Sequence, residues 1–204
     1  MKWAETSFSM LNTTSKNYSM QTLKNIKYLL IVFFSLVFIS CSRADEDEDV
    51  LSQEDISNII LNVKDDVTGI VKTYNYTVNA ATNPVIKLED GKTYTVEAIF
   101  KNGNEDETES IKSAKDEHFL IFDFQGSQIE LTREDDESST RTDGNKLGLL
   151  TKWNVIKTLN APNPKLELQL IHDAVSVSEE QSGSAFGTAE GGETDAVAVF
   201  GMSN

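Results

Sequence analysis

Residues 93–100 read Thr-Tyr-Thr-Val-Glu-Ala-Ile-Phe, and this stretch decides the fold class. Its apolar side chains fall at every second position, namely at Tyr94, Val96, Ala98 and Phe100. Side chains of a β-strand alternate between the two faces of a sheet, whereas an amphipathic helix repeats every three to four residues. The pattern therefore predicts a strand with one face in a core and the other in water.

Similar short runs continue along the chain, separated by turn dipeptides such as Asp90-Gly91 and Asn102-Gly103. Strands and helices do not alternate, which argues against a parallel α/β sheet. The sequence predicts an all-β, single-domain antiparallel β-sandwich over residues 56–204, with immunoglobulin-like connectivity. The predicted strands are Asn58–Val63, Lys72–Val78, Val85–Leu88, Thr93–Lys101, His118–Gln125, Gln128–Arg133, Leu149–Ile156, Lys165–Asp173 and Thr194–Phe200.

The polar stretches between these strands predict loops. Residues 102–109 and 134–140 are rich in acidic side chains, and we expect both to form long acidic loops. Residues 182–192 are rich in serine and glycine and predict a loop that connects the last two strands.

The first forty residues have the character of a targeting segment. Lys24 and Lys27 precede an apolar run over residues 28–39, and Ser40 follows it. The run is shorter than the ~20 apolar residues that a transmembrane helix needs. The sequence therefore predicts a signal peptide over residues 1–40, in which residues 1–19 are an over-extended start because Met20 would give a signal of normal length.

Cys41 is the only cysteine of the chain, so no intramolecular disulfide can form. Residues 38–41, Phe-Ile-Ser-Cys, resemble the lipobox of bacterial lipoproteins in the form found in Bacteroidetes. The resemblance implies that Cys41 carries lipid such as palmitate and that residues 41–55 tether the domain. The acidic run 45–49 resembles the signal that sends such lipoproteins to the outer face of the outer membrane. We expect an outer-membrane lipid anchor, with the domain facing the periplasm or the cell surface.

The chain has 18 basic and 33 acidic residues and a net charge of −15. Such a surface repels nucleic acid and favours cations or basic partners, although a large charge also serves solubility alone. The sequence lacks a phosphate-binding loop, a nucleophile elbow and a His-Glu-x-x-His motif. We therefore predict that the protein is not an enzyme; a hydrolase is the least favoured class.

The two histidines are the residues that indicate a function most strongly. His118 is in phase with Leu120 of its strand, and His172 is in phase with Leu170, so both predict positions at the edge of the core. Glu193 and Asp195 are in phase with the valines of the last strand. If this strand pairs antiparallel with residues 165–173, both acids lie at the rim that holds His172.

His118 joins the same rim only if its strand runs in the direction of the last strand. Imidazoles and carboxylates at one rim form a ligand set for zinc or another divalent transition metal, so His118, His172, Glu193 and Asp195 are candidate metal ligands. The alternative is that each histidine hydrogen-bonds a carboxylate and no metal binds. Both histidines have acidic neighbours along the chain, in residues 116–118 and 172–173.

Four stretches, residues 116–119, 144–153, 168–172 and 191–195, resemble a family of small flavobacterial lipoproteins in the same order. Members are often called "type 1 periplasmic binding fold" proteins, although that fold requires alternating strands and helices. The resemblance implies an accessory role beside a TonB-dependent outer-membrane receptor. The leading hypothesis is a non-enzymatic lipoprotein that captures a ligand such as a divalent metal. The rival is a structural or adhesive β-sandwich without a small-molecule ligand, in which the acidic loops contact other proteins.

Overall fold

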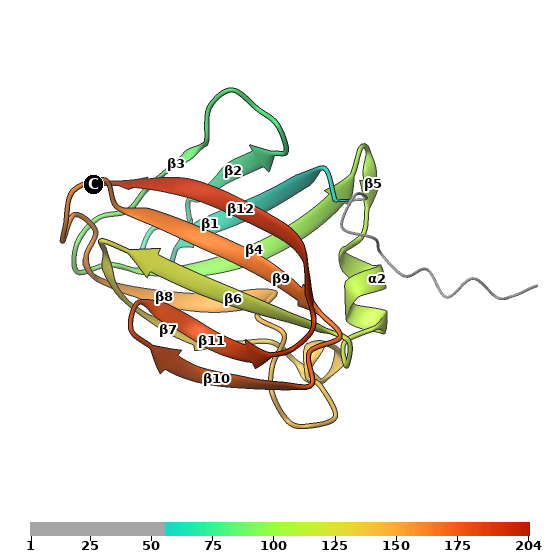
Figure 1. The fold of residues 1–204 in the computed structure, drawn as a ribbon. Helices are drawn as coiled ribbons and strands as arrows, with labels where there is room; N and C mark the ends of the chain where they lie inside the picture. Colours follow the sequence, from blue (N-terminus) through green and yellow to red (C-terminus); the bar gives the residue numbers. More distant parts are fainter. Residues whose placement is uncertain (1–55) are drawn as a thin grey trace, which may run out of the picture. The chain divides into compact units, whose positions relative to one another are not determined.

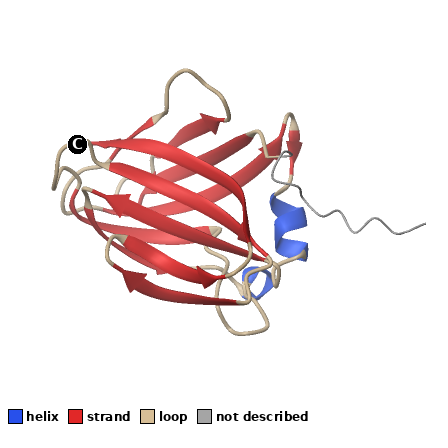
Figure 2. Cartoon of the chain, viewed as in Figure 1, coloured by secondary structure: helices blue, strands red, loops and turns tan. Residues whose placement is uncertain are grey.

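The computed structural model describes residues 56–204 as a β-sandwich of two sheets (Figures 1 and 2). The predicted signal peptide, Cys41 and acidic tether lie outside the described residues. In the first sheet the order is β2-β1-β4-β8-β7, with β5 paired to β4. Its strands are β1 (Asn58–Asp65), β2 (Val71–Thr77), β4 (Thr93–Asn102), β5 (Glu105–Asp106), β7 (Gln128–Arg133) and β8 (Leu150–Lys157).

The second sheet holds the candidate site. Its order is β10-β11-β6-β9-β12-β3, and every pairing is antiparallel except that of β12 with β3. Its strands are β3 (Val85–Lys87), β6 (His118–Gln125), β9 (Lys165–His172), β10 (Ser176–Ser182), β11 (Ala185–Glu190) and β12 (Glu193–Ser203). The predicted antiparallel sandwich is confirmed at this level, whereas an immunoglobulin-like connectivity is not.

The core lies between the sheets where the alternation predicted it. Tyr94, Val96, Ala98 and Phe100 are all buried, and the leucines of β9 are buried on the facing sheet. Trp153 fills the centre, and its ring meets Phe124 edge-on at a centroid distance of 5.0 Å. The regular period of two therefore determined which face of each long strand turns inward.

Three predicted loops contain secondary structure. Residues 102–109 include β5 and the start of helix α2 (Thr108–Ser113), and residues 134–140 include the short helix η2 (Glu137–Ser139). The stretch predicted as a loop before the last strand contributes to a hairpin of β10 and β11. β10 is an edge strand of mainly polar residues and buries little, so it lacks the apolar alternation that marks a core strand.

A buried arginine joins the sheets beside this hairpin. Arg133 at the end of β7 is 4 % exposed, and its guanidinium lies 4.3 Å from the ring centroid of Phe119. It donates to the carbonyl oxygens of Leu120 at 2.5 Å and Leu147 at 2.6 Å, with longer contacts to those of Lys146 and Phe186. Burial lowers the pKa of Arg133 to about 10, so the group stays charged at neutral pH.

Candidate metal site

Three neighbouring strands bring both histidines to one rim of the second sheet. β6 is antiparallel to β9, and β9 is antiparallel to β12, so the starts of β6 and β12 meet the end of β9. His118 lies directly opposite His172 in this register. The strand of His118 therefore runs in the direction of the last strand, which is the condition that the sequence set for a shared rim.

The two imidazole rings stack on each other, with ring centroids 5.0 Å apart and planes inclined by 17°. The side chain of His118 is 3 % exposed and that of His172 is 12 % exposed. The buried carboxylate of Asp195 lies against both rings. Its Oδ2 is 3.6 Å from Nε2 of His118, and its Oδ1 is 3.7 Å from Nδ1 of His172. Three of the four predicted ligands thus form one cluster.

A β-bulge determines where Asp195 points. The register of β12 against β9 shifts between Thr194 and Ala196, which leaves Asp195 as an extra residue. In a regular strand Asp195 would share the face of Val197, which is 40 % exposed. Instead, the consecutive residues Asp195 and Ala196 are both buried. Bulges re-aim side chains in this way and recur beside functional sites.

The shared phase of the two acids and the valines therefore does not hold in the structure. The sequence grouped both acids with the valines, but the residues of β12 that enter the core are Ala196, Ala198, Phe200 and Met202. The bulge reverses the alternation, so Asp195 lies inside although Val197 lies outside. Glu193 is exposed at the start of β12, opposite His172, and has no ion pair or side-chain hydrogen bond with another described residue.

Two further carboxylates lie on the outer side of His172. Its Nε2 is 3.6 Å from Oε2 of Glu117 and 3.8 Å from Oδ1 of Asp173, and one ligand atom from each of these three residues lies within 4.8 Å of the others. Asp173 adopts a left-handed φ of 52°, and its N–H donates to the carbonyl of Glu117. Sequence reasoning noted these acids as neighbours of the histidines but did not place them in the site.

The cluster contains two buried polar atoms that lack a hydrogen-bond partner, Nε2 of His118 and Oδ2 of Asp195. Nδ1 of His118 lies 3.0 Å from the carbonyl of Ala114, which can only accept, so this nitrogen carries a proton. In a neutral ring Nε2 then presents a lone pair to a carboxylate oxygen. Burying two acceptors face to face is unfavourable, and either a cation between them or a proton on Nε2 of His118 removes this cost.

The spacing of these atoms suits a metal ion. At 3.6 Å the two atoms are beyond the ~3.2 Å limit of a good hydrogen bond. Two ligands that each lie ~2.0–2.2 Å from one zinc ion are at most about 4 Å apart, so an ion fits between Nε2 of His118 and Oδ2 of Asp195. Among the described residues, the three whose ligand atoms all lie within 4.8 Å of one another are Glu117, His172 and Asp173, so His118, Asp195 and His172 can share one ion only after a side chain shifts. The donor set contains nitrogen and oxygen and no sulfur, which suits zinc and other divalent transition metals.

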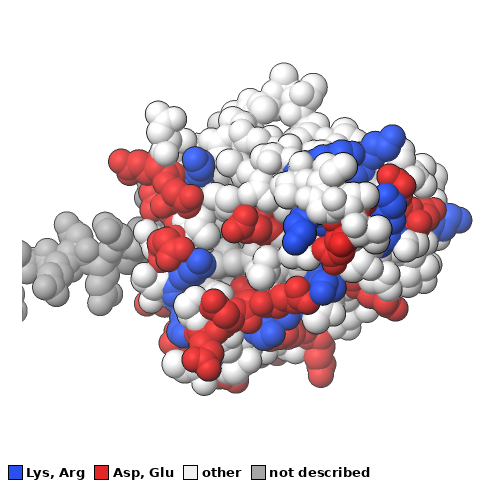
Figure 3. All heavy atoms as spheres, turned by 180° about the vertical axis from the view of Figure 1, so that it is seen from behind, with Lys and Arg blue, Asp and Glu red and all other residues white. Residues whose placement is uncertain are grey.

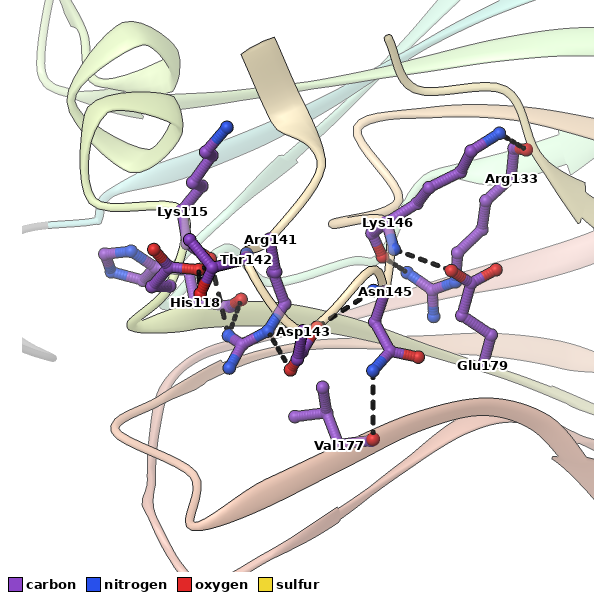
Figure 4. A network of polar contacts seen from close by, with 11 residues as sticks. Lys115, His118, Arg133, Arg141, Thr142, Asp143, Asn145, Lys146, Val177 and Glu179 are labelled. Carbon is purple, nitrogen blue, oxygen red and sulfur yellow. Dashed lines mark hydrogen bonds and ion pairs between the residues drawn. The ribbon is translucent and has the colours of Figure 1, made fainter. Parts of the chain in front are cut away.

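The backbone around His118 is held by a second buried arginine (Figure 4). Arg141 donates to the carbonyl of His118 at 2.8 Å and to that of Lys115 at 3.3 Å, and it pairs with Asp143 at 3.0 Å. Helix α2 ends at Ser113, just before the carbonyl of Ala114 that faces the His118 ring. These contacts fix the ring orientation from outside the cluster, as outer partners do around metal-binding histidines.

Fold and site together define the class of this protein as a β-sandwich with a buried His–Asp–His cluster at one rim. A scan against models of known families found no match, and neither curated proteins nor solved structures gave a significant match. In the part of the chain that the structure describes, no helix has the length and apolar character needed to cross a membrane.

Proposed function

We propose that this protein is a non-enzymatic, lipid-anchored binding protein that captures a divalent transition metal at the His118–Asp195–His172 cluster. One observation carries the proposal. Each imidazole turns one nitrogen toward Asp195 and the other toward an acceptor outside the cluster, Ala114 O for His118 and the Glu117 carboxylate for His172. In metal-binding histidines an outer hydrogen-bond acceptor fixes the tautomer and leaves the inner nitrogen free. The carbonyl of Ala114 is such an acceptor for His118 at 3.0 Å, whereas the Glu117 carboxylate lies 3.6 Å from Nε2 of His172, beyond hydrogen-bond distance.

Glu117 and Asp173 then act as outer partners of His172 and help to attract the cation. Glu193, which the sequence grouped with the ligands, lies at the mouth of the rim and is a candidate for the first contact with an arriving ion. In an accessory protein beside a TonB-dependent receptor, such a site would hold the metal for transfer, and this partner follows from the family resemblance alone.

Calorimetry of the purified protein with zinc, manganese, iron(II) and copper(II) tests the metal site. We expect saturable binding of at least one ion with a Kd of about 1 µM or tighter. His172→Ala should weaken binding about 100-fold or more, and Glu117→Gln about 10- to 100-fold, as changes of outer partners do. Affinity should fall when the solution is acidified, because protons compete with the metal for the ligand nitrogen and oxygen atoms.

Glu179→Gln is the matched control. Glu179 is an acid of the same sheet that lies outside the cluster, where its Oε1 accepts from the N–H of Lys146. The metal affinity of the Glu179→Gln variant should equal that of the unmodified protein. If none of the four ions gives a saturable heat, or if His172→Ala binds as well as the unmodified protein, the cluster is a structural hydrogen-bonding arrangement and the metal proposal fails.

The lipid anchor has a separate test. Replacing Cys41 by serine removes the thiol that accepts the lipid, so the protein should move from the membrane fraction to the soluble fraction. Fractionation of cells that produce each form, followed by immunodetection, would measure this shift. If the Cys41→Ser protein stays in the membrane fraction as fully as the unmodified protein does, the anchor is not at Cys41.

The second candidate function is a structural or adhesive role without a metal. Exposed aliphatic side chains favour it: Val67 is 83 % exposed, and Ile70 and Val85 are also exposed near the ends of β1, β2 and β3. The connection between β2 and β3 has no charged residue, and the upper part of the face in Figure 3 is uncharged. This role requires contact with another protein and does not require a metal. The calorimetry described above therefore separates the structural role from the metal-binding function.

A further inference from the structure

A pocket of about 440 Å³ opens at the end of the sandwich opposite the histidine cluster. This volume lies within the ~300–1,000 Å³ that is usual for small-molecule sites. The walls come from the end of β6, the β6–β7 turn, the β8–β9 connection and the β10–β11 turn. His118 opens β6 and Phe124 lies near its end, which places the pocket about 20 Å from the cluster at ~3.4 Å per residue.

The lining of this pocket is uncharged throughout, although charged residues make up 25 % of the chain. Phe124, Ile129 and Phe186 line it and are each at most 7 % exposed, so only a small apolar surface is open to a ligand. An ionised ligand would lose its water shell here without gaining a countercharge. The pocket therefore suits a neutral ligand with some apolar surface.

Three primary amides stand at the mouth of the pocket, on Gln128, Asn160 and Gln181, and all three residues are exposed. Those of Gln128 and Asn160 make no side-chain hydrogen bond to another described residue. Gln181 donates from Nε2 to the carbonyl of Gly183, and its own amide oxygen remains free to accept. A primary amide both donates and accepts, as does a hydroxyl group, so the two match each other.

The walls are joined by backbone hydrogen bonds, so the pocket is formed before a ligand arrives. The carbonyl of Gly126 accepts from the N–H groups of Asn160 and Ala161, both at 3.0 Å, and Phe124 N–H donates to the carbonyl of Ser184 at 3.0 Å. Gly126 has a φ of 76°, a conformation that other residues rarely adopt. A preformed site loses less conformational entropy when it binds.

From these features we infer a second ligand site in this pocket, which takes a small, neutral, hydroxyl-rich molecule of the size of a monosaccharide or disaccharide. The small apolar surface, which includes the exposed Ala161, would contact the C–H face of the sugar ring, and the amides would hydrogen-bond its hydroxyl groups. The inference does not depend on the metal site, since it uses other residues at the other end of the sandwich.

Saturation-transfer NMR and calorimetry of the mature protein would test it with glucose, galactose, mannose, N-acetylglucosamine, maltose and lactose as probes. We expect saturable binding of at least one sugar with a Kd of about 1 mM or tighter. Glucuronate should bind at least about 10-fold more weakly than glucose, because the pocket offers no cation and the chain is strongly acidic. Ala161→Trp should abolish binding by filling the pocket.

The double variant Gln128→Ala, Asn160→Ala should weaken binding about 10-fold, since it removes two hydrogen-bonding groups. Asn154→Ala, an exposed amide on β8 outside the pocket, should bind like the unmodified protein. Should the tryptophan variant fail to fold, the double variant decides alone. No saturable signal with any sugar, or unchanged binding by the double variant, would overturn the inference.

Discussion

Replacing Arg133 by methionine should destabilise the domain by about 3–5 kcal/mol. Methionine fills a similar volume but has no N–H groups, so four backbone carbonyls lose the hydrogen bond that the guanidinium supplies, although that of Leu147 still accepts from the N–H of Leu120. Each buried acceptor left without a donor costs about 1–3 kcal/mol. A buried ion pair can be replaced by apolar residues with little loss when both partners change, but these partners belong to the backbone and cannot be removed.

Urea unfolding of Arg133→Met and Arg133→Lys, followed by tryptophan fluorescence, would measure this effect. Lysine keeps the charge but offers three donors from one atom, so it cannot reach both β6 and the segment before β8 and should recover only part of the loss. We also expect faster hydrogen exchange in β11, because only two residue pairs join β11 to β6 beside the guanidinium. A methionine variant within about 0.5 kcal/mol of the unmodified protein would show that desolvation of the guanidinium cancels its hydrogen bonds.

Replacing Gly192 by alanine should weaken both the fold and the metal site. Gly192 has a φ of 77°, and a Cβ there would lie 2.5 Å from the carbonyl oxygen of His172 and 2.8 Å from the N atom of Ala174. Both neighbours are backbone atoms, so the chain on either side of Asp173 has to move. We expect a loss of about 2–4 kcal/mol in the free energy of unfolding from strain and overpacking. The affinity for metal should fall about 10-fold or more because His172 is displaced.

Gly144→Ala is the matched control for this prediction. Gly144 has a φ of 88°, but a Cβ there meets no atom within 4 Å. Alanine at this position therefore has the backbone strain of a left-handed φ but collides with no other atom. The Gly144→Ala substitution should lower the free energy of unfolding by about 1 kcal/mol and leave the metal affinity unchanged. Thermal unfolding and calorimetry of both variants give the comparison. Equal losses of stability in the two variants, with metal affinity retained in Gly192→Ala, would mean that the close approach at His172 has no role.

The site could be predicted in part because its histidines lie on regular strands. His118 is in phase with Leu120, Phe122 and Phe124, and His172 with Leu166, Leu168 and Leu170, so the inward facing of both follows from local sequence, although the out-of-phase neighbours Phe119 and Ile171 are also buried. Arg133 was assigned correctly to a strand, but nothing in its strand indicated a buried guanidinium, since arginine is ordinarily exposed. Its burial depends on carbonyls from β6, β11 and the segment before β8, which are distant in sequence.

The sequence by itself determined the all-β class, the long strands and the inward facing of the two histidines. All three depend on apolar residues at every second position, a pattern that is visible within each strand without knowledge of its neighbours. Only the tertiary structure decided which strands are neighbours, that β10 and β11 form a hairpin, and that Asp195 lies between the two imidazoles. A bulge arises when a strand adjusts its register to the strand beside it, and the carboxylate of Asp195 is buried because β12 makes that adjustment against β9.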